Sequence, residues 1–389
     1  MGNSSLQIIA ENVSVIASPK TWIEGGAIQQ LQTTAKLPGM HRVVGMPDLH
    51  PGRGYPVGAA FLSMGRFYPA LIGGDIGCGM RLLKTDLSIA KLSLDKLVKR
   101  LGNIDAPLIE QNDFWRARVR SYELQGSGFE HSLGTIGGGN HFAELQQITE
   151  VFDQAIFSAH GLDRKQVMLL VHSGSRGFGG QILRQHIEQY GHHGLAEGDV
   201  AATTYWDQHQ QALDFALCNR SLIAERICAN LATQAEMVLD IHHNFLSKVV
   251  IDGARGFLHR KGAAPSDQGL IVIPGSRGDY SFVVQARLGN QGELASDSLF
   301  SLAHGAGRKW MRSECEPRLR QRYTATQLSR TALDSRVVCH DKGLIFEEAP
   351  EAYKPIDSVI ESLQEAGLIN VVAKLKPLIS YKTSGGCCL

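Results

Sequence analysis

Short apolar runs that end at loops rich in glycine recur along this chain. Residues 42–46, 70–72, 167–171 and 270–273 are such runs, and residues 281–284 have the same strand-like character. Apolar runs of this length are typical of buried strands. Because open sheets bind ligands where their strands end, we expect the loops to converge on one site.

Apolar residues at helical spacing predict helices in three other stretches. These are residues 94–101, residues 221–241, which lead into the histidines at 242 and 243, and residues 359–363, which precede Gly367. Residues 115–120 instead alternate between polar and apolar, which predicts a strand with arginines on one face. Such a face is either a solvated edge, which is slightly favoured, or a nucleic-acid contact.

The composition is that of an ordinary globular protein. The chain has 389 residues, of which 43% are hydrophobic and 20% are charged. Its 39 Lys and Arg residues and 38 Asp and Glu residues leave a net charge of +1, so only a local basic patch would indicate nucleic-acid binding. No charged or Ser/Pro-rich linker and no repeat divides the chain. We therefore expect a single large domain over residues 1–389, of the α+β class, with mixed sheets and surrounding helices.

The N-terminal segment and the cysteines favour the cytoplasm. Residues 1–6 do not resemble a signal peptide, and no apolar run is long enough to cross a membrane. The 7 cysteines are an odd number, which favours free thiols in a reducing compartment. Two of them lie in residues 385–389, which we interpret as a flexible tail.

The stretch from Gly73 to Met80 carries two candidate metal ligands. Asp75 and Cys78 lie three residues apart among glycines, which allow close approach of a ligand. Both side chains bind metals when deprotonated, and a thiolate can bind two cations at once. Taken alone, the stretch is better explained as a tight turn with a buried thiol.

Three histidines in other glycine-, serine- or asparagine-containing loops supply partners for this pair. His141, His172 and His243 each lie at the end of a predicted element. With Asp75 and Cys78 they form a set of five ligands, more than a tetrahedral structural zinc requires. The set suits two cations that share a thiolate, an arrangement that stabilises both oxygens in displacements at phosphorus.

A histidine flanked by small residues is the candidate nucleophile. His304 precedes Gly305, Ala306, Gly307 and Arg308, so a bulky group can reach its ring nitrogen. The backbone amides of this loop can cradle a phosphate, although a histidine packed in a tight turn is the plainer alternative. Basic residues between 308 and 322 form either a solvated helix face or a path for a phosphate backbone, with even odds.

Six motifs in order resemble the RtcB family of RNA ligases. They are Asp75-Ile-Gly-Cys78-Gly-Met, Gly-Gly-Gly-Asn140-His141-Phe, His172-Ser-Gly-Ser-Arg176-Gly, His243-Asn244, Pro274-Gly-Ser276 and His304-Gly-Ala-Gly-Arg308. The resemblance implies a GTP- and manganese-dependent ligase. It would join RNA ending in a 2′,3′-cyclic phosphate or 3′-phosphate to RNA beginning with a 5′-hydroxyl, in tRNA splicing or RNA repair.

The resemblance also implies roles for individual residues. Asp75, Cys78, His141, His172 and His243 match the ligands of two Mn²⁺ ions, with Cys78 as the bridge, and His304 matches the histidine that accepts GMP, with Asp48 orienting it or assisting the 5′-hydroxyl. The nucleotide-contacting positions are Asn140, Glu144, Asn244, Pro274, Gly275, Ser276, Arg277, Ser281, Gly305, Ala306, Gly307 and Lys382. Arg176 and Arg308 match candidate contacts to RNA phosphates.

Some residues depart from the pattern of the family. Arg277 stands where an apolar residue is frequent, residues 309–312 are unusual, and Lys382 is followed by further residues although the matching lysine normally ends the chain. These departures point to the branch associated with release-factor-like partners and RNA repair. An archease-like activator is the other protein partner that the resemblance suggests.

Two other functions and a second metal are the alternatives. A metal-dependent RNA cyclic phosphodiesterase without ligation is disfavoured by the intact His304 loop. A non-catalytic RNA-binding relative is disfavoured because the nucleophile and all five ligand positions are present. A Cys/His site intrinsically prefers Zn²⁺ to Mn²⁺ by the usual order of affinities, so residue chemistry and family resemblance differ on the metal.

Overall fold

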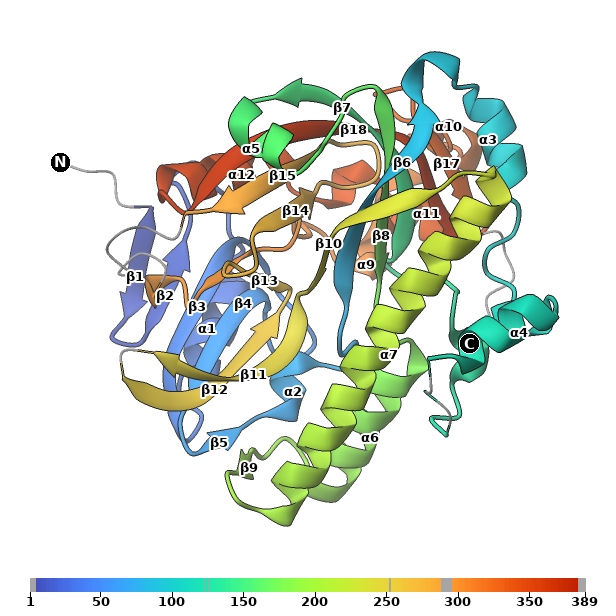
Figure 1. The fold of residues 1–389 in the computed structure, drawn as a ribbon. Helices are drawn as coiled ribbons and strands as arrows, with labels where there is room; N and C mark the ends of the chain where they lie inside the picture. The colour runs from blue at the N-terminus through green and yellow to red at the C-terminus, as the bar shows by residue number, and fades with distance from the viewer. Residues whose placement is uncertain (1–4, 123, 125, 252, 288–295, 384–389) are drawn as a thin grey trace.

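Two large sheets form the centre of the molecule (Figure 1). The computed structural model describes residues 5–122, 124, 126–251, 253–287 and 296–383. In the order in which they pair, the strands of the first sheet are β1 (Leu6–Ala10), β2 (Val13–Ile16), β3 (Met40–His50), β4 (Val57–Ser63), β12 (Ala254–Lys261) and β11 (Asn244–Ile251). Those of the second are β10 (Ala235–His242), β6 (Gly79–Ser88), β8 (Gln166–Ser173), β7 (Phe142–Val151), β18 (Ile369–Thr383), β15 (Ser281–Ala286) and β14 (Leu270–Pro274), with β17 (Arg336–Cys339) also paired to β18.

Both sheets are mixed, as predicted. The pairs β2–β3 and β17–β18 are parallel, whereas the other pairs in these sheets are antiparallel. Two short pairs lie outside them, β13 (Ala263–Pro265) with β16 (Ser301–Ala303) and β5 (Arg66–Phe67) with β9 (Leu195–Ala196). Together with the helices, these sheets confirm the α+β class.

Helices surround the sheets. They are α1 (Gly25–Thr34), α2 (Pro69–Ile72), α3 (Leu94–Leu101), α4 (Asp113–Arg120), α5 (Gln154–Ala159), α6 (Gly177–Tyr190), α7 (Val200–Leu231), α9 (Arg312–Leu319), α10 (Ala325–Leu328), α11 (Leu344–Glu347) and α12 (Ile356–Glu365), with 3₁₀ turns at Ile89–Lys91, Leu108–Glu110, Glu130–Ser132 and Pro350–Ala352. The long helix α7 runs beside α6 along one side of the molecule (Figure 1). Among the described helices, none has the length and apolar character that a membrane crossing needs.

One apolar core joins the two sheets. Val44 and Leu62 of the first sheet belong to the same buried cluster as Leu82 and Leu170 of the second, and helix α12 adds Val359. Burial of apolar area on this scale is the main favourable term in folding. The two sheets therefore pack on each other, while the extent of a single domain over residues 1–389 stays a prediction.

Helix α7 anchors the loops that matter for function. The side chain of Asn219 accepts a hydrogen bond from Gly134 N and donates to Gly174 O. The buried guanidinium of Arg220 donates to Gly77 O and Ser173 O and forms an ion pair with Asp240. Because buried carbonyls require partners, α7 fixes the shape of the loops around Gly77 and Gly174.

Most predicted elements are confirmed. The apolar runs at 42–46, 167–171, 270–273 and 281–284 lie in β3, β8, β14 and β15, and the helices predicted at 94–101 and 359–363 are α3 and part of α12. The run at 70–72 is the exception, because Pro69 begins the short helix α2 there. The residues of the predicted tail, 385–389, lie outside the described part of the chain.

The predicted strand at 115–120 is wrong, because these residues belong to helix α4. Asn112 caps this helix by accepting a hydrogen bond from Trp115 N at 3.0 Å. Trp115 and Val119 are one turn apart and both buried, so a helix explains the pattern as well as a strand does. Arg118 pairs with Glu225 of α7.

The predicted helix at 221–241 is correct only in its first half. Helix α7 ends at Leu231, followed by Ala232 in the left-handed conformation, and the chain then forms β10. Leu239 and Ile241 are buried on alternate positions of this strand. His243 is therefore delivered by the junction of two strands, β10 and β11, and not by a helix.

Candidate functional site

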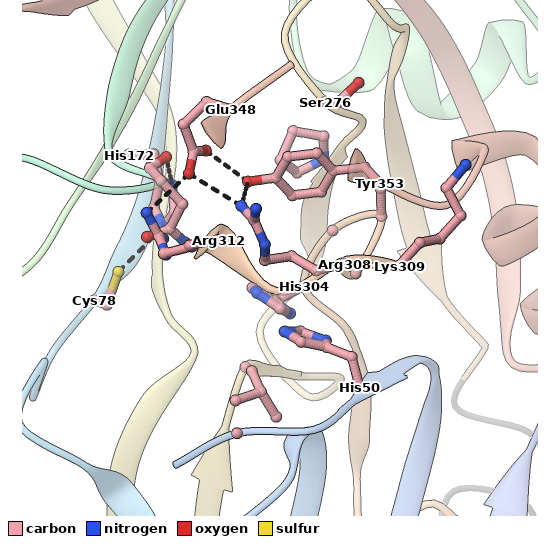
Figure 2. A pocket seen from close by; sticks show the side chains of 18 of the residues that line it. His50, Cys78, His172, Ser276, His304, Arg308, Lys309, Arg312, Glu348 and Tyr353 are labelled. Carbon is pink, nitrogen blue, oxygen red and sulfur yellow. Dashed lines mark hydrogen bonds and ion pairs between the residues drawn. The ribbon is translucent and has the colours of Figure 1, made fainter. Parts of the chain in front are cut away.

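A cavity of about 750 Å³ lies where the glycine-rich loops meet (Figure 2). Its lining comes from the end of β3, the loop before β6, the loop before β7, the β10–β11 junction, and the loops after β14 and β16. The residues 308–313 and Glu348, Tyr353 and Lys382 complete the wall. The expected convergence of distant loops on one site is thus observed.

Tight backbone packing holds Asp75 and Cys78 in place. Cys78 N donates to Asp75 O, and Gly77 N donates to Asn244 O at 2.8 Å. Gly77 has φ 75°, and a Cβ at Gly174 would lie 2.1 Å from Asp75 Oδ1. The glycines thus allow two chain segments to approach the ligand pair more closely than any side chain would permit.

The predicted ligands form two groups that share Cys78. Cys78 Sγ lies 3.1 Å from His172 Nε2, and His172 Nε2 lies 3.3 Å from His243 Nε2. On the other side, Cys78 Sγ lies 3.3 Å from His141 Nε2, which lies 2.8 Å from Asp75 Oδ2. Within each group the ligand atoms all lie within 4.8 Å of one another. The geometry fits one cation in each group with the cysteine between them.

The protonation of the buried ligands also fits cation binding. Burial lowers the pKa of His172 and of His243 well below the usual value, so both imidazoles are neutral and present a lone pair. Burial raises the pKa of the Cys78 thiol, and the nearby Asp75 raises it further. A bound cation reverses this effect, because coordination deprotonates a thiol. The donor set therefore fits a pair of divalent ions.

Asp48 holds the candidate nucleophile in one orientation. His304 Nδ1 lies 2.6 Å from Asp48 Oδ2, and His304 N donates to the same oxygen at 3.3 Å. Asp48 is fully buried, and Gly307 approaches so closely that a Cβ there would lie 2.1 Å from Asp48 O. The His304 ring packs against the ring of His243, with 4.7 Å between centroids. The predicted nucleophile thus adjoins one metal group.

Most of the predicted nucleotide contacts line the cavity. They are Asn140, Glu144, Asn244, Pro274, Gly275, Ser276, Arg277, Gly305, Ala306, Gly307 and Lys382. Ser281 does not line it, but its hydroxyl accepts a hydrogen bond from Gln146, which also donates to the Glu144 carboxylate. Burial raises the pKa of Glu144 to about 7.

The two arginines predicted to contact RNA differ in position. Arg176 does not line the cavity and donates to Thr135 Oγ1 at 3.3 Å. Arg308 lines it, but its guanidinium already donates to Trp310 O, Glu348 Oε1, Tyr353 OH, Glu347 O and Cys315 Sγ. Contacts of either residue with RNA stay predictions, and Arg308 would have to exchange a partner to make one.

Sequence reasoning missed a buried charge cluster around Glu348. Its carboxylate pairs with Arg308 and Arg312 at 3.1 and 3.0 Å and accepts a hydrogen bond from Tyr353 (Figure 2). Burial alone would raise the pKa of Glu348, but Lys382, Arg312 and Arg308 lower it to about 2. Glu348 lies in no glycine-rich loop, so nothing in the sequence pattern indicated it.

His50 was a second omission, although it follows Asp48 in a loop with Pro and Gly. It lines the cavity near His304 (Figure 2), and its Nδ1 lies 2.9 Å from Asp48 O. Burial lowers the pKa of His50 to about 4, so the ring is neutral. The position of His50 beside Asp48 in such a loop was the signal that could have found it.

The fold and the cavity define an α+β protein with a Cys/His/Asp cluster suited to metal binding, beside a histidine oriented by a carboxylate. The family model described as tRNA-splicing ligase RtcB matches residues 30–116 and 106–383. The chain therefore belongs to the RtcB family.

Individual relatives agree with this assignment. The chain is 54% identical over 378 residues to RNA-splicing ligase RtcB2 of Escherichia coli, with 97% of each chain covered. It is 29% identical over 415 residues to RtcB1 of the same strain, covering 92% of this chain and 95% of that one. The tRNA-splicing ligase RtcB of Archaeoglobus fulgidus is 28% identical over 445 residues, with 92% and 91% covered. The chain is thus more similar to RtcB2 than to RtcB1.

Proposed function

We propose that this protein is a GTP-dependent RNA ligase that joins a 2′,3′-cyclic phosphate or 3′-phosphate end to a 5′-hydroxyl end through a guanylylated His304. The observation that carries the proposal is the placement of Cys78 in both metal groups, next to a histidine held by a buried carboxylate. Membership of a family described by tRNA-splicing ligation supports it.

In the first step His304 attacks the α-phosphorus of GTP. The bond between His304 Nδ1 and Asp48 keeps the proton on Nδ1, which leaves the lone pair of Nε2 for the attack. A phosphorus–nitrogen bond forms, the bond to the β-phosphate breaks, and pyrophosphate leaves. Asp48 stabilises the positive charge that develops on the ring.

The walls of the cavity recognise the nucleotide. The backbone amides of Gly305, Ala306 and Gly307 are the proposed donors to a phosphate at His304, because that loop lines the cavity beside the ring. Guanine carries two neighbouring donors, which match the carboxylate of Glu144, and Lys382 supplies a donor for the guanine carbonyl oxygen. Asn140, Asn244, Arg277 and residues 274–276 form the remaining contacts, and Ser281 acts through Gln146.

The site would hold two divalent cations. The family resemblance implies Mn²⁺, whereas the chemistry of the Cys and His ligands favours Zn²⁺. Cys78, His172 and His243 would hold one, and Asp75, Cys78 and His141 would hold the other. When bound, such a pair neutralises the negative charge that builds up on phosphoryl oxygens.

RNA joining follows in three steps. Water opens a cyclic phosphate to a 3′-phosphate. An oxygen of that phosphate then attacks the phosphorus of the histidine–GMP, which breaks the phosphorus–nitrogen bond and regenerates His304. Finally the 5′-hydroxyl attacks the 3′-phosphorus, GMP leaves, and a phosphodiester forms. Arg176 and Arg308 are the proposed contacts to RNA phosphates.

The biological setting is part of the proposal. We expect the protein to act in the cytoplasm in RNA repair or tRNA splicing, and we expect no membrane among its partners. An archease-like activator or a release-factor-like protein would be its protein partner. The higher similarity to RtcB2 than to RtcB1 supports a role distinct from that of RtcB1.

Labelling with α-³²P GTP tests the proposal. After incubation with Mn²⁺ and denaturing electrophoresis, we expect label on the wild type and none on His304→Ala or Cys78→Ala. His160→Ala removes an exposed histidine away from the cavity and should be labelled normally. A wild type without label would contradict the proposal. Labelling without joined RNA would indicate a nucleotide-transfer activity other than ligation. Hydrolysis of the cyclic phosphate without labelling or joining would identify a phosphodiesterase.

A further inference from the structure

A second hollow adjoins the active-site cavity at Trp310. It is an open groove of about 500 Å³, lined by Trp310, Pro317, Arg318, Gln321 and Arg322, which we call the Trp310 groove. Trp310 also lines the active-site cavity, together with Lys309 and Arg312. Trp310 is therefore common to the linings of the cavity and of the groove.

The structure separates the basic residues between 308 and 322 by environment. Arg308 is engaged in the Glu348 cluster, and Arg320 lies over the ring of Phe346 and pairs with Glu316. Lys309 and Arg312 line the cavity, whereas Arg318 and Arg322 are exposed and line the groove. Figure 2 shows Lys309 on the far side of Arg308 from Cys78 in this view. Positively charged side chains therefore line both the cavity and the groove.

Hydrogen bonds fix the main chain at Trp310, and two cations lie near its indole ring. Trp310 O accepts a hydrogen bond from Arg308, and Lys309 N donates to Ala352 O at 2.7 Å. The guanidinium of Arg318 lies 5.0 Å from the centroid of the indole, and Lys309 Nζ lies 5.9 Å from it. A half-buried aromatic ring flanked by cations is the combination that binds single-stranded nucleic acid.

The two glutamates of helix α9 are both paired with arginines. Glu314 is paired with Arg318 at 3.5 Å, and Glu316 is paired with Arg320. Among the described residues, Arg322 has no acidic partner. A phosphate can displace the exposed Glu314 pair at little cost, because ion pairs at the surface contribute little.

We propose that the Trp310 groove binds a single-stranded segment of the RNA substrate, a few nucleotides from the end that reacts at His304. A base stacks on Trp310, and the neighbouring phosphates contact Arg318 and Arg322. The inference rests on the proposed function, since it assumes that an RNA end lies in the cavity.

Binding of a fluorescent single-stranded RNA of roughly 12 nucleotides with a 3′-phosphate, measured by anisotropy at several salt concentrations, tests the inference. Trp310→Leu should weaken binding about tenfold, in line with the usual effect of losing one stacked base. Arg318→Gln with Arg322→Gln should reduce the slope of log affinity against log salt by about 1.4, at about 0.7 for each phosphate contact to a single strand. Arg320→Gln, on the same helix–turn segment but outside the groove, should change neither quantity.

Labelling of His304 by GTP is the control in the same variants. For Arg318→Gln with Arg322→Gln it should remain at the wild-type level, because neither residue lines the active-site cavity. If the groove variants bind RNA as tightly as the wild type or as Arg320→Gln, the inference is wrong. The proposed function would still stand in that case, provided that His304 is labelled. Normal RNA binding by a wild type that is never labelled would overturn the proposed function instead. If duplex RNA alone lost affinity in the groove variants, the proposal of a single strand would be wrong.

Discussion

Cys78 is the residue on which both metal groups depend. Its Sγ lies 3.1 Å from His172 Nε2 and 3.3 Å from His141 Nε2, so it faces a ligand of each group. A serine or alanine could occupy the same small, buried space, but neither supplies a sulfur that two cations can share. The requirement at this position is therefore chemical rather than one of packing.

Glu144 is the residue whose titration should govern recognition of guanine. Burial raises its pKa to about 7, so the carboxylate is ionised above that pH and protonated below it. Because guanine donates to the ionised form, we expect the Kd for GTP to rise up to tenfold per pH unit below about 7. Calorimetry with His304→Ala, which cannot react, measures this directly.

The variant Glu144→Gln separates this effect from other titrations. It should bind GTP more weakly than the wild type above pH 7, and its affinity should no longer depend on the ionisation of residue 144. A pH dependence that is the same in both proteins would assign the titration to another group, such as the phosphates of GTP.

The segment between α11 and α12 is hydrogen-bonded to the two chain segments that carry Asp48 and the candidate nucleophile. Lys354 Nζ donates to Pro47 O at 3.1 Å and to Leu49 O at 2.8 Å, on either side of Asp48. Lys354 N donates to Gly307 O at 3.0 Å, in the loop of His304. One residue thus ties the segment of the carboxylate to the loop of the histidine, and we expect it to act as a positioning residue.

Lys354→Met should lower the rate of His304 guanylylation and leave the KM for GTP unchanged. It should also lower the free energy of unfolding by about 1–3 kcal/mol, because buried carbonyls lose their donor. Lys354→Arg should recover part of the rate, since it restores donors at that position. Single-turnover labelling and denaturant unfolding measure the two effects. A change in KM with an unchanged rate would contradict a positioning role.

The elements show what the sequence could and could not predict. Apolar runs such as 167–171 predicted β8 correctly, because a strand buried on both faces needs apolar residues at every position. The prediction of a strand at residues 115–120 was wrong because six residues with alternating character also fit a helix. The Asn112 cap distinguishes the helix from the strand. The predicted helix extended to residue 241, beyond the end of α7, because local spacing does not reveal the left-handed conformation of Ala232.

The grouping of the candidate site residues was more predictable than the elements that carry them. The candidate ligands and the candidate nucleophile lie in glycine-rich motifs, where close approach of two backbones limits the choice of residue. Glu348 and Lys354 lie in a segment with no such motif, and their roles come from contacts with residues that are distant in sequence. Only the three-dimensional structure could place them.

At the scale of the whole molecule, the candidate metal ligands lie where the two sheets meet. His172 belongs to β8 and Cys78 precedes β6, both in the second sheet, whereas His243 lies where the chain passes from β10 of that sheet to β11 of the first. Cations bound here would link the sheets to each other. Metal binding should therefore stabilise the fold as a whole.

Mn²⁺ should raise the melting temperature of the wild type relative to the protein in EDTA. Each ion present at about a hundred times its Kd contributes about 2.7 kcal/mol if it binds only the folded chain. Cys78→Ala should lose most of this increase, whereas Cys228→Ala, on α7 outside both groups, should retain it. Equal increases in the two variants would place the stabilising ions elsewhere.

Electron paramagnetic resonance of the Mn²⁺-loaded protein tests the central claim most directly, because two ions that share one sulfur are magnetically coupled. We predict two Mn²⁺ per chain with the spectrum of a coupled pair in the wild type. Cys78→Ala should lose that coupling, and Cys228→Ala should keep it. A wild-type spectrum of isolated ions, or the same coupled spectrum in Cys78→Ala, would contradict a site built around Cys78.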